Sequence, residues 1–135
     1  MSVLHLITDA EAEADPAIKA VFDDIRETRG SDFVNNIWRA LAADPAGLKR
    51  TWESVKSLMV VPGALDPKVR EMIYIAVSTA NNCSYWVQPL TAAARAKGMT
   101  PAEHGELMQI IALAASTNHL ATGLQVPVDT EFEIA

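Results

Sequence analysis

The spacing of apolar residues predicts a chain built almost entirely of helices. Apolar side chains recur three or four residues apart in several separate segments, as they do along one face of an α-helix. The clearest stripes, in chain order, are Ile18, Val21, Phe22 and Ile25; Val34, Ile37 and Leu41; Leu48, Trp52, Val55 and Met59; and Leu107, Ile110, Ile111 and Ala114. Residues 67–80 are apolar nearly all round, which predicts a central buried helix.

Four helix starts are marked by a capping residue followed by proline. A capping oxygen accepts a backbone N–H that has no partner within the helix, and proline at the first helical position loses nothing by lacking its own. The four pairs are Asp15-Pro16, Asp44-Pro45, Asp66-Pro67 and Thr100-Pro101. A further helix is predicted to begin after Asn82 and to run to about Lys97, with Gly98 as its C-terminal stop. We therefore expect an all-α fold, one domain of about six helices over residues 1–135.

Half of the 135 residues are apolar, which is a high fraction for one small chain. A domain of this size hides roughly two-thirds of the surface that its unfolded chain exposes. The excess indicates helices that are apolar on more than one face, and it predicts a homo-oligomer. A dimer, a trimer and a hexamer all fit the sequence.

Charge and hydropathy exclude several classes of partner. The net charge of −6 argues against nucleic acid and anionic membrane, because both bind basic surfaces. Even a long unbroken apolar run such as Met72–Val77 is far short of the about 20 residues that a membrane span needs. Residues 1–15 contain no Lys or Arg and no long apolar core, so we expect no signal peptide. Only one cysteine is present, which excludes an intrachain disulfide and fits the reducing cytoplasm.

The most informative chemical feature is that single cysteine, Cys83, with Glu71 eleven intervening residues upstream. Cys83 stands where a helix is predicted to begin, and the unpaired N–H groups at a helix start favour a thiolate. Free cysteines are also among the most buried residue types, so Cys83 is either a reactive thiol or a small apolar filler. Glu71 is either a buried carboxylate with a raised pKa that serves as a base, or one half of a salt bridge.

The order of several segments resembles the AhpD-like proteins of the carboxymuconolactone decarboxylase superfamily. The segments are Phe33–Leu41, Leu65–Pro67, Arg70-Glu71, Ala76–Ser78, Asn81–Tyr85, Ala92–Met99 and, more loosely, Gly123–Pro127. They extend over about a hundred residues, and the subgroup is often labelled peroxidase-related. The resemblance implies an all-helical fold, oligomers, and the antioxidant activity of a peroxiredoxin-type thiol peroxidase, with no cofactor.

The family's active motif is a glutamate, eleven residues, a CxxC pair, then three residues and a histidine. The resemblance makes Glu71 the glutamate of the proton relay and Cys83 the first, resolving cysteine. Trp86 stands where the peroxidatic cysteine is expected, and Leu90 stands where the histidine is expected. Half of the motif is therefore substituted, including the group that attacks the peroxide.

Trp86 and Leu90 have two possible roles. With Cys83 they lie on one face of the predicted helix, so they either fill a former pocket as core or line an apolar pocket that binds a ligand. Pro89 lies deep in the same helix and is expected to kink it.

The three histidines suggest no site of their own. His104 follows a capping box and is expected to face solvent, and His5 lies in the N-terminal segment. His119 has no partner that the sequence identifies. Their separations do not match a metal site, so we expect neither a metal nor a cofactor.

Three functions fit these observations. The first is an AhpD-like thiol peroxidase in which Cys83 acts alone, with a peroxide as substrate and an external thiol as reductant. The second is lactone decarboxylation, the superfamily's other named activity. The third is a non-catalytic oligomeric protein, a scaffold or a binder of an apolar ligand, that kept the fold and lost the site.

Overall fold

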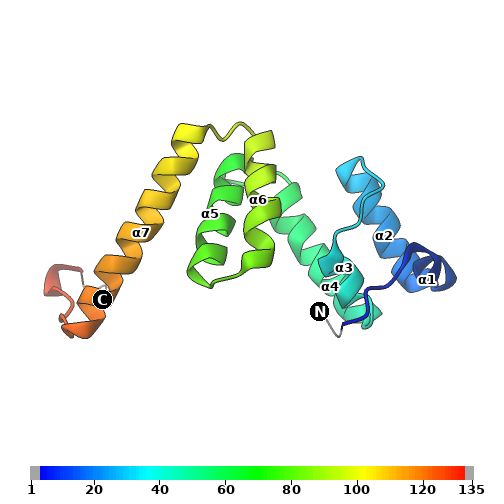
Figure 1. Ribbon diagram of the computed structural model, residues 1–135, viewed down its shortest axis with the longest axis horizontal. Helices are drawn as coiled ribbons and strands as arrows, with labels where there is room; N and C mark the ends of the chain where they lie inside the picture. The colour runs from blue at the N-terminus through cyan, green and yellow to red at the C-terminus, as the bar shows by residue number, and fades with distance from the viewer. Residues whose placement is uncertain (1–3, 133–135) are drawn as a thin grey trace. The chain divides into compact units, whose positions relative to one another are not determined.

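The computed structural model describes residues 4–132, which form helices joined by short connections and contain no strand (Figure 1). The all-α prediction is confirmed. The helices are α1 (Asp9–Ala14), α2 (Pro16–Arg29), α3 (Asn36–Leu41), α4 (Pro45–Val55), α5 (Pro67–Ala80), α6 (Ser84–Ala96) and α7 (Pro101–Gly123). A π-helical turn, η1 (Lys56–Val60), follows α4, and a 3₁₀ turn, η2 (Thr130–Phe132), lies near the C-terminus.

The chain divides into two compact units between Pro62 and Gly63. The assignment of residues 1–135 to one domain stays a prediction.

The first unit is built from α1 to α4 around a core of large side chains. Phe22, Ile25, Trp38 and Leu48 are fully buried, and Trp52 is nearly so. The Trp38 and Trp52 rings meet edge to face, with their centroids 5.4 Å apart. This geometry places the positive edge of one ring on the negative face of the other, which adds to the hydrophobic gain of burying both.

Helix α1 is the element that the apolar spacing did not predict. Thr8 forms a capping box with Glu11: the Glu11 backbone N–H donates to the Thr8 hydroxyl, and the Thr8 N–H donates to the Glu11 carboxylate. Asp9 on α1 then accepts hydrogen bonds from Arg26 and Arg39, at 2.9 and 2.8 Å. Residues 9–14 contain no apolar side chain larger than alanine, so the capping box is the sequence signal of this helix.

The third predicted stripe, which ended at Met59, is divided in the structure. Regular α-helix ends at Val55, and the backbone N–H of Val61 donates to the Lys56 carbonyl, which closes the π-helical turn. Leu58, in that turn, is largely exposed.

The second unit is a hairpin of α5 and α6 with α7 packed on α5 (Figure 1). Its core is aliphatic and consists of Ile75, Leu90, Ala94, Met99 and Leu107. Helix α5, predicted as a central buried helix, is covered on one face only in the single chain, because Val69, Ile73 and Val77 are 38–54% exposed. The covered face of α5 holds Ile75 and Glu71.

Candidate functional site

Cys83 lies at the connection between α5 and α6, and it is the residue that caps α6. The sequence assigned the cap to Asn82, but Asn82 adopts a left-handed conformation (φ 56°) that ends α5. This turn lets the Cys83 N–H donate to the Ser78 carbonyl at 2.8 Å. Asparagine tolerates the left-handed region better than most residues, which explains its place here.

The thiol is half-buried and its side chain makes no capping hydrogen bond. It stands at the first turn of a 13-residue helix, whose N-terminal N–H groups carry partial positive charge.

Glu71 lies on the covered face of α5 and is only 5% exposed. Its Oε1 atom lies 2.5 Å from the Nζ atom of Lys97, the residue that ends α6. The antiparallel course of α5 and α6 brings these two residues together although they are 26 positions apart. Both expected features of Glu71, burial and a salt bridge, therefore occur at once. The partner is Lys97, and the neighbouring Arg70 donates from Nε to the Leu65 carbonyl.

The second carboxylate oxygen of Glu71, Oε2, is buried and has no hydrogen-bond partner among residues 4–132. The carboxylate is thus satisfied on one side only. A buried acceptor without a donor is costly, so the ion pair with Lys97 is the main interaction that offsets the burial of this charge.

The structure does not bring Glu71 and Cys83 into contact. The Cys83 N–H is bonded to Ser78, which lies seven residues beyond Glu71 along α5. At 1.5 Å per residue this separation is about 10 Å along the helix axis. In the structure the Glu71 carboxylate bonds to Lys97 and not to the thiol, so proton exchange between the two would need intervening groups.

Trp86 and Leu90 pack within the second unit. Leu90 is buried in the aliphatic core, and Trp86 is half-buried against that core. The Trp86 ring lies 5.7 Å from the ring of Tyr74 and 5.5 Å from that of Tyr85. Both residues thus occupy space as packing side chains. Helix α6 continues through Pro89 to Ala96, so the proline does not end it.

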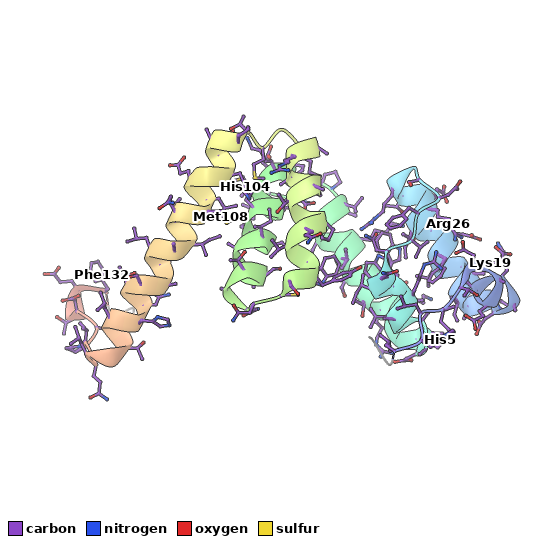
Figure 2. All side chains as sticks on the ribbon, viewed as in Figure 1. His5, Lys19, Arg26, His104, Met108 and Phe132 are labelled. Carbon is purple, nitrogen blue, oxygen red and sulfur yellow. The ribbon has the colours of Figure 1, made fainter. Side chains whose placement is uncertain are left out.

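The histidines lie apart from Cys83 in the sequence, and the structure gives them different surroundings. His104 is half-buried near the start of α7, close to Met108, which contacts the core (Figure 2). The expectation that His104 faces solvent is therefore only partly met. His119 is exposed, and His5 pairs with Glu11 at 3.0 Å. Within residues 4–132, no three His, Cys, Asp or Glu side chains are grouped closely enough to hold a metal.

A pocket of about 510 Å³ lies between α2 and α4 in the first unit, and no sequence pattern indicated it. It is lined by Ala17, Ala20, Val21, Asp24, Pro45, Ala46, Lys49, Trp52 and Glu53. The indole N–H of Trp52 donates to Asp24 at 2.7 Å, and the Lys56 ammonium lies 2.9 Å from the same carboxylate. The Trp52 hydrogen bond, and then Lys56, hold the pKa of Asp24 below its ordinary value. The carboxylate is fully engaged, which leaves the pocket mainly apolar.

Comparisons with known proteins agree with this geometry. Residues 46–129 match the model of the carboxymuconolactone decarboxylase family. A search of curated proteins found no match. Among solved structures, the alkylhydroperoxidase AhpD core from Rhodospirillum rubrum is 65% identical and has a TM-score of 0.96, with 100% of this chain and 99% of that chain covered. No helix within residues 4–132 is long and apolar enough to cross a membrane. The chain belongs to the carboxymuconolactone decarboxylase family and has the helical fold of its AhpD-like members.

Proposed function

We propose that this protein is a thiol-dependent hydroperoxide reductase in which Cys83 is the only reacting thiol. The observation that carries the proposal is the position of Cys83, half-buried at the first turn of α6 without a capping hydrogen bond. The similarity to an alkylhydroperoxidase supports the same reaction class.

The reaction has two stages. The Cys83 thiolate attacks one oxygen of the hydroperoxide, the O–O bond breaks, and the products are a cysteine sulfenic acid and an alkoxide that takes a proton to become an alcohol. A first external thiol then condenses with the sulfenic acid to give a mixed disulfide and water. A second external thiol displaces Cys83, which regenerates its thiol and leaves the external pair as a disulfide.

The remaining motif positions act indirectly in this proposal. Trp86 and Leu90 shape the apolar surroundings of the helix start. The assignment of Glu71 to proton transfer stays a prediction, since Glu71 lies about 10 Å along α5 from Ser78, which bonds to Cys83, and its carboxylate is engaged by Lys97. External thiols are abundant in the cytoplasm, which is where we expect the protein to act.

The test is consumption of an organic hydroperoxide in the presence of dithiothreitol. We expect Cys83→Ser to abolish the consumption above background, and a 1,3-diketone probe to trap the sulfenic acid only in the wild type. Ser84→Ala, which changes the adjacent exposed residue, is the matched control and should retain activity. Equal consumption by the wild type and Cys83→Ser would refute the proposal.

A second candidate is a non-catalytic oligomeric protein that binds an apolar ligand or serves as a scaffold. It is favoured by Trp86 and Leu90, which pack as core residues where the motif expects reacting groups. An inactive wild type that binds hydrophobic ligands or partner chains would support this candidate.

We also propose that the protein is an obligate homo-oligomer, with more than about 2,000 Å² buried in total, as is common for such assemblies. The exposed apolar residues of α5 and α7 support this proposal. Sedimentation that finds a stable folded monomer at micromolar concentration would refute it.

A further inference from the structure

The second half of α7 is apolar, uncharged and uncovered. Residues 107–128 contain no Asp, Glu, Lys or Arg. Leu107 is buried in the core of the second unit, and Met108 and Ile111 pack against that core. From residue 112 onward, every residue of α7 is exposed.

A regular row of side chains runs along the face of α7 that the hairpin does not cover. The row, here called the α7 seam, consists of Ile110, Leu113, Thr117, Leu120 and Leu124. Its spacing alternates between three and four residues, which is the period of a coiled-coil contact face. At 3.6 residues per turn, the α7 seam lies roughly 150° around the helix from Leu107, Met108 and Ile111.

The polar member of the row does not interrupt its apolar character. The Thr117 hydroxyl donates within the helix, with the Leu113 carbonyl at 3.1 Å and the Ala114 carbonyl at 3.2 Å. The α7 seam is therefore apolar apart from one hydroxyl, and it leaves no side-chain hydrogen-bond donor to satisfy from outside.

The surface of the segment is large enough for a protein interface. Six aliphatic residues in and beside the row are 58–73% exposed. They are Ile110, Leu113, Leu120, Leu124, Val126 and Val128. At about 1.45 Å² per dalton for an exposed residue, they leave on the order of 600 Å² on each chain. A stable interface typically buries about 800 Å² per partner, so this segment supplies most of one.

Charge favours a second copy of the chain as the occupant. Each copy carries a net charge of −6, so two copies repel one another unless they meet through a surface without charge. The α7 seam lies in the 22-residue segment that contains no charged side chain. The same negative charge disfavours docking on an anionic lipid surface.

We propose that the α7 seam docks against the α7 seam of a second copy of this chain. The contact uses the same surface on both copies, as a two-fold dimer does. This proposal names the surface for the homo-oligomer proposed above and rests on it. It is independent of the peroxide chemistry at Cys83.

The first experiment introduces a charged side chain into the α7 seam. As a control, the same charge is introduced at the residue next to it in the sequence. Sedimentation is measured for the wild type, Leu120→Asp and His119→Asp. His119 is exposed, and its side chain leaves the helix about 100° around the axis from that of Leu120. We expect association at micromolar concentration for the wild type and His119→Asp, and at least a tenfold weaker association for Leu120→Asp. Unchanged association of Leu120→Asp would overturn the proposal. The proposal would also be overturned if the wild type is a monomer and Leu120→Asp destabilises it. The α7 seam would then be covered by the first unit of the same chain.

The second experiment does not depend on how well a charged variant folds. In a Cys83→Ser background, Thr117→Cys is oxidised mildly and compared with Asn118→Cys, which is the next residue along and is also exposed. We expect a covalent dimer from Thr117→Cys and little from Asn118→Cys. Equal cross-linking of the two would overturn the proposal. Cys83→Ser itself should leave the sedimented mass unchanged while it abolishes peroxide consumption, so failure of one proposal is distinguishable from failure of the other.

Discussion

The two units of this chain reach their folded state by different means. The first unit buries aromatic side chains in its core and surrounds them with charged hydrogen bonds, such as those from Arg26 and Arg39 to Asp9. The second unit has a small aliphatic core and leaves most of α7 uncovered. The comparison indicates that the first unit holds much of its stability within the chain, whereas the second depends more on what covers it.

The largest expected loss of stability follows a substitution in the aromatic core of the first unit. Trp38→Ala removes a fully buried ring and its edge-to-face contact with Trp52. We expect a loss of about 3–5 kcal/mol in the free energy of unfolding, because the neighbouring side chains collapse only partly into the cavity. Denaturant titration followed by circular dichroism measures this. A loss below 1 kcal/mol would show that this core is not the main source of stability in the unit.

The next effect concerns the substituted motif in the second unit. Trp86→Cys together with Leu90→His restores the residues that the family motif expects. We expect peroxide-dependent formation of a disulfide between positions 83 and 86, which the wild type cannot form. Removal of a buried Trp typically costs about 3–5 kcal/mol, and Trp86 is only half-buried, so the loss here should be smaller.

Thiol counts before and after peroxide treatment detect that disulfide. Trp86→Ser with Leu90→His is the matched control, since it creates a similar cavity without a second thiol. If the wild type already reduces organic hydroperoxides as fast as the restored variant, the motif is not degenerate.

A smaller effect is expected at the ion pair between α5 and α6. Lys97→Met leaves the buried Glu71 carboxylate without its cation, which costs about 3–5 kcal/mol for a wholly buried pair. The Lys97 side chain is 35% exposed, so we expect about 1–2 kcal/mol. The double variant Glu71→Leu with Lys97→Met should recover most of the loss, and a double-mutant cycle measures the coupling. Additive losses would mean that the two groups do not interact in solution.

The smallest effect is the acid sensitivity of the first unit. Hydrogen bonds from Arg39, and then the charges of both arginines, lower the pKa of Asp9 below its ordinary 3.8, and the Trp52 indole does the same for Asp24. A depressed folded-state pKa contributes stability that is fully present above the unfolded pKa and is lost as pH falls below about 4. Both carboxylates are well exposed, so each contribution is small. We expect Asp24→Asn to flatten the pH dependence of unfolding between about pH 4 and 2, with the exposed Asp32→Asn as the control. An identical pH dependence in both variants would contradict this.

Local signals in the sequence predicted the helix boundaries well. The four Asp-Pro and Thr-Pro pairs mark the first residues of α2, α4, α5 and α7. Gly98, with a φ of 99°, follows the end of α6 as predicted. These features depend on neighbouring residues alone, so a sequence contains them in full.

Features that depend on contacts between distant residues could not be predicted. The partner of Glu71 is fixed by the register of two antiparallel helices, and nothing in the local sequence around Lys97 indicates it. For Trp86 and Leu90 the sequence was compatible with core packing and with an apolar ligand pocket. Their packing in the second unit depends on residues of other helices, which the local sequence does not contain. The apolar segment of α7 was correctly predicted as helix. The stripe Leu107, Ile110, Ile111 and Ala114 was expected to face inward, but Ile110 and Ala114 are exposed.

Because Cys83 and Trp86 are close in the chain, the protein contains an intrinsic fluorophore next to a thiol that can be labelled. Trp38 and Trp52 belong to the first unit, so Trp86 is the one indole in the second, and it lies one helical turn from the one thiol in the chain. A quencher attached to Cys83 would therefore act on Trp86 across one helical turn, about 5 Å. The fluorescence lifetime of Trp86 in the labelled protein would then follow the opening of the α6 start.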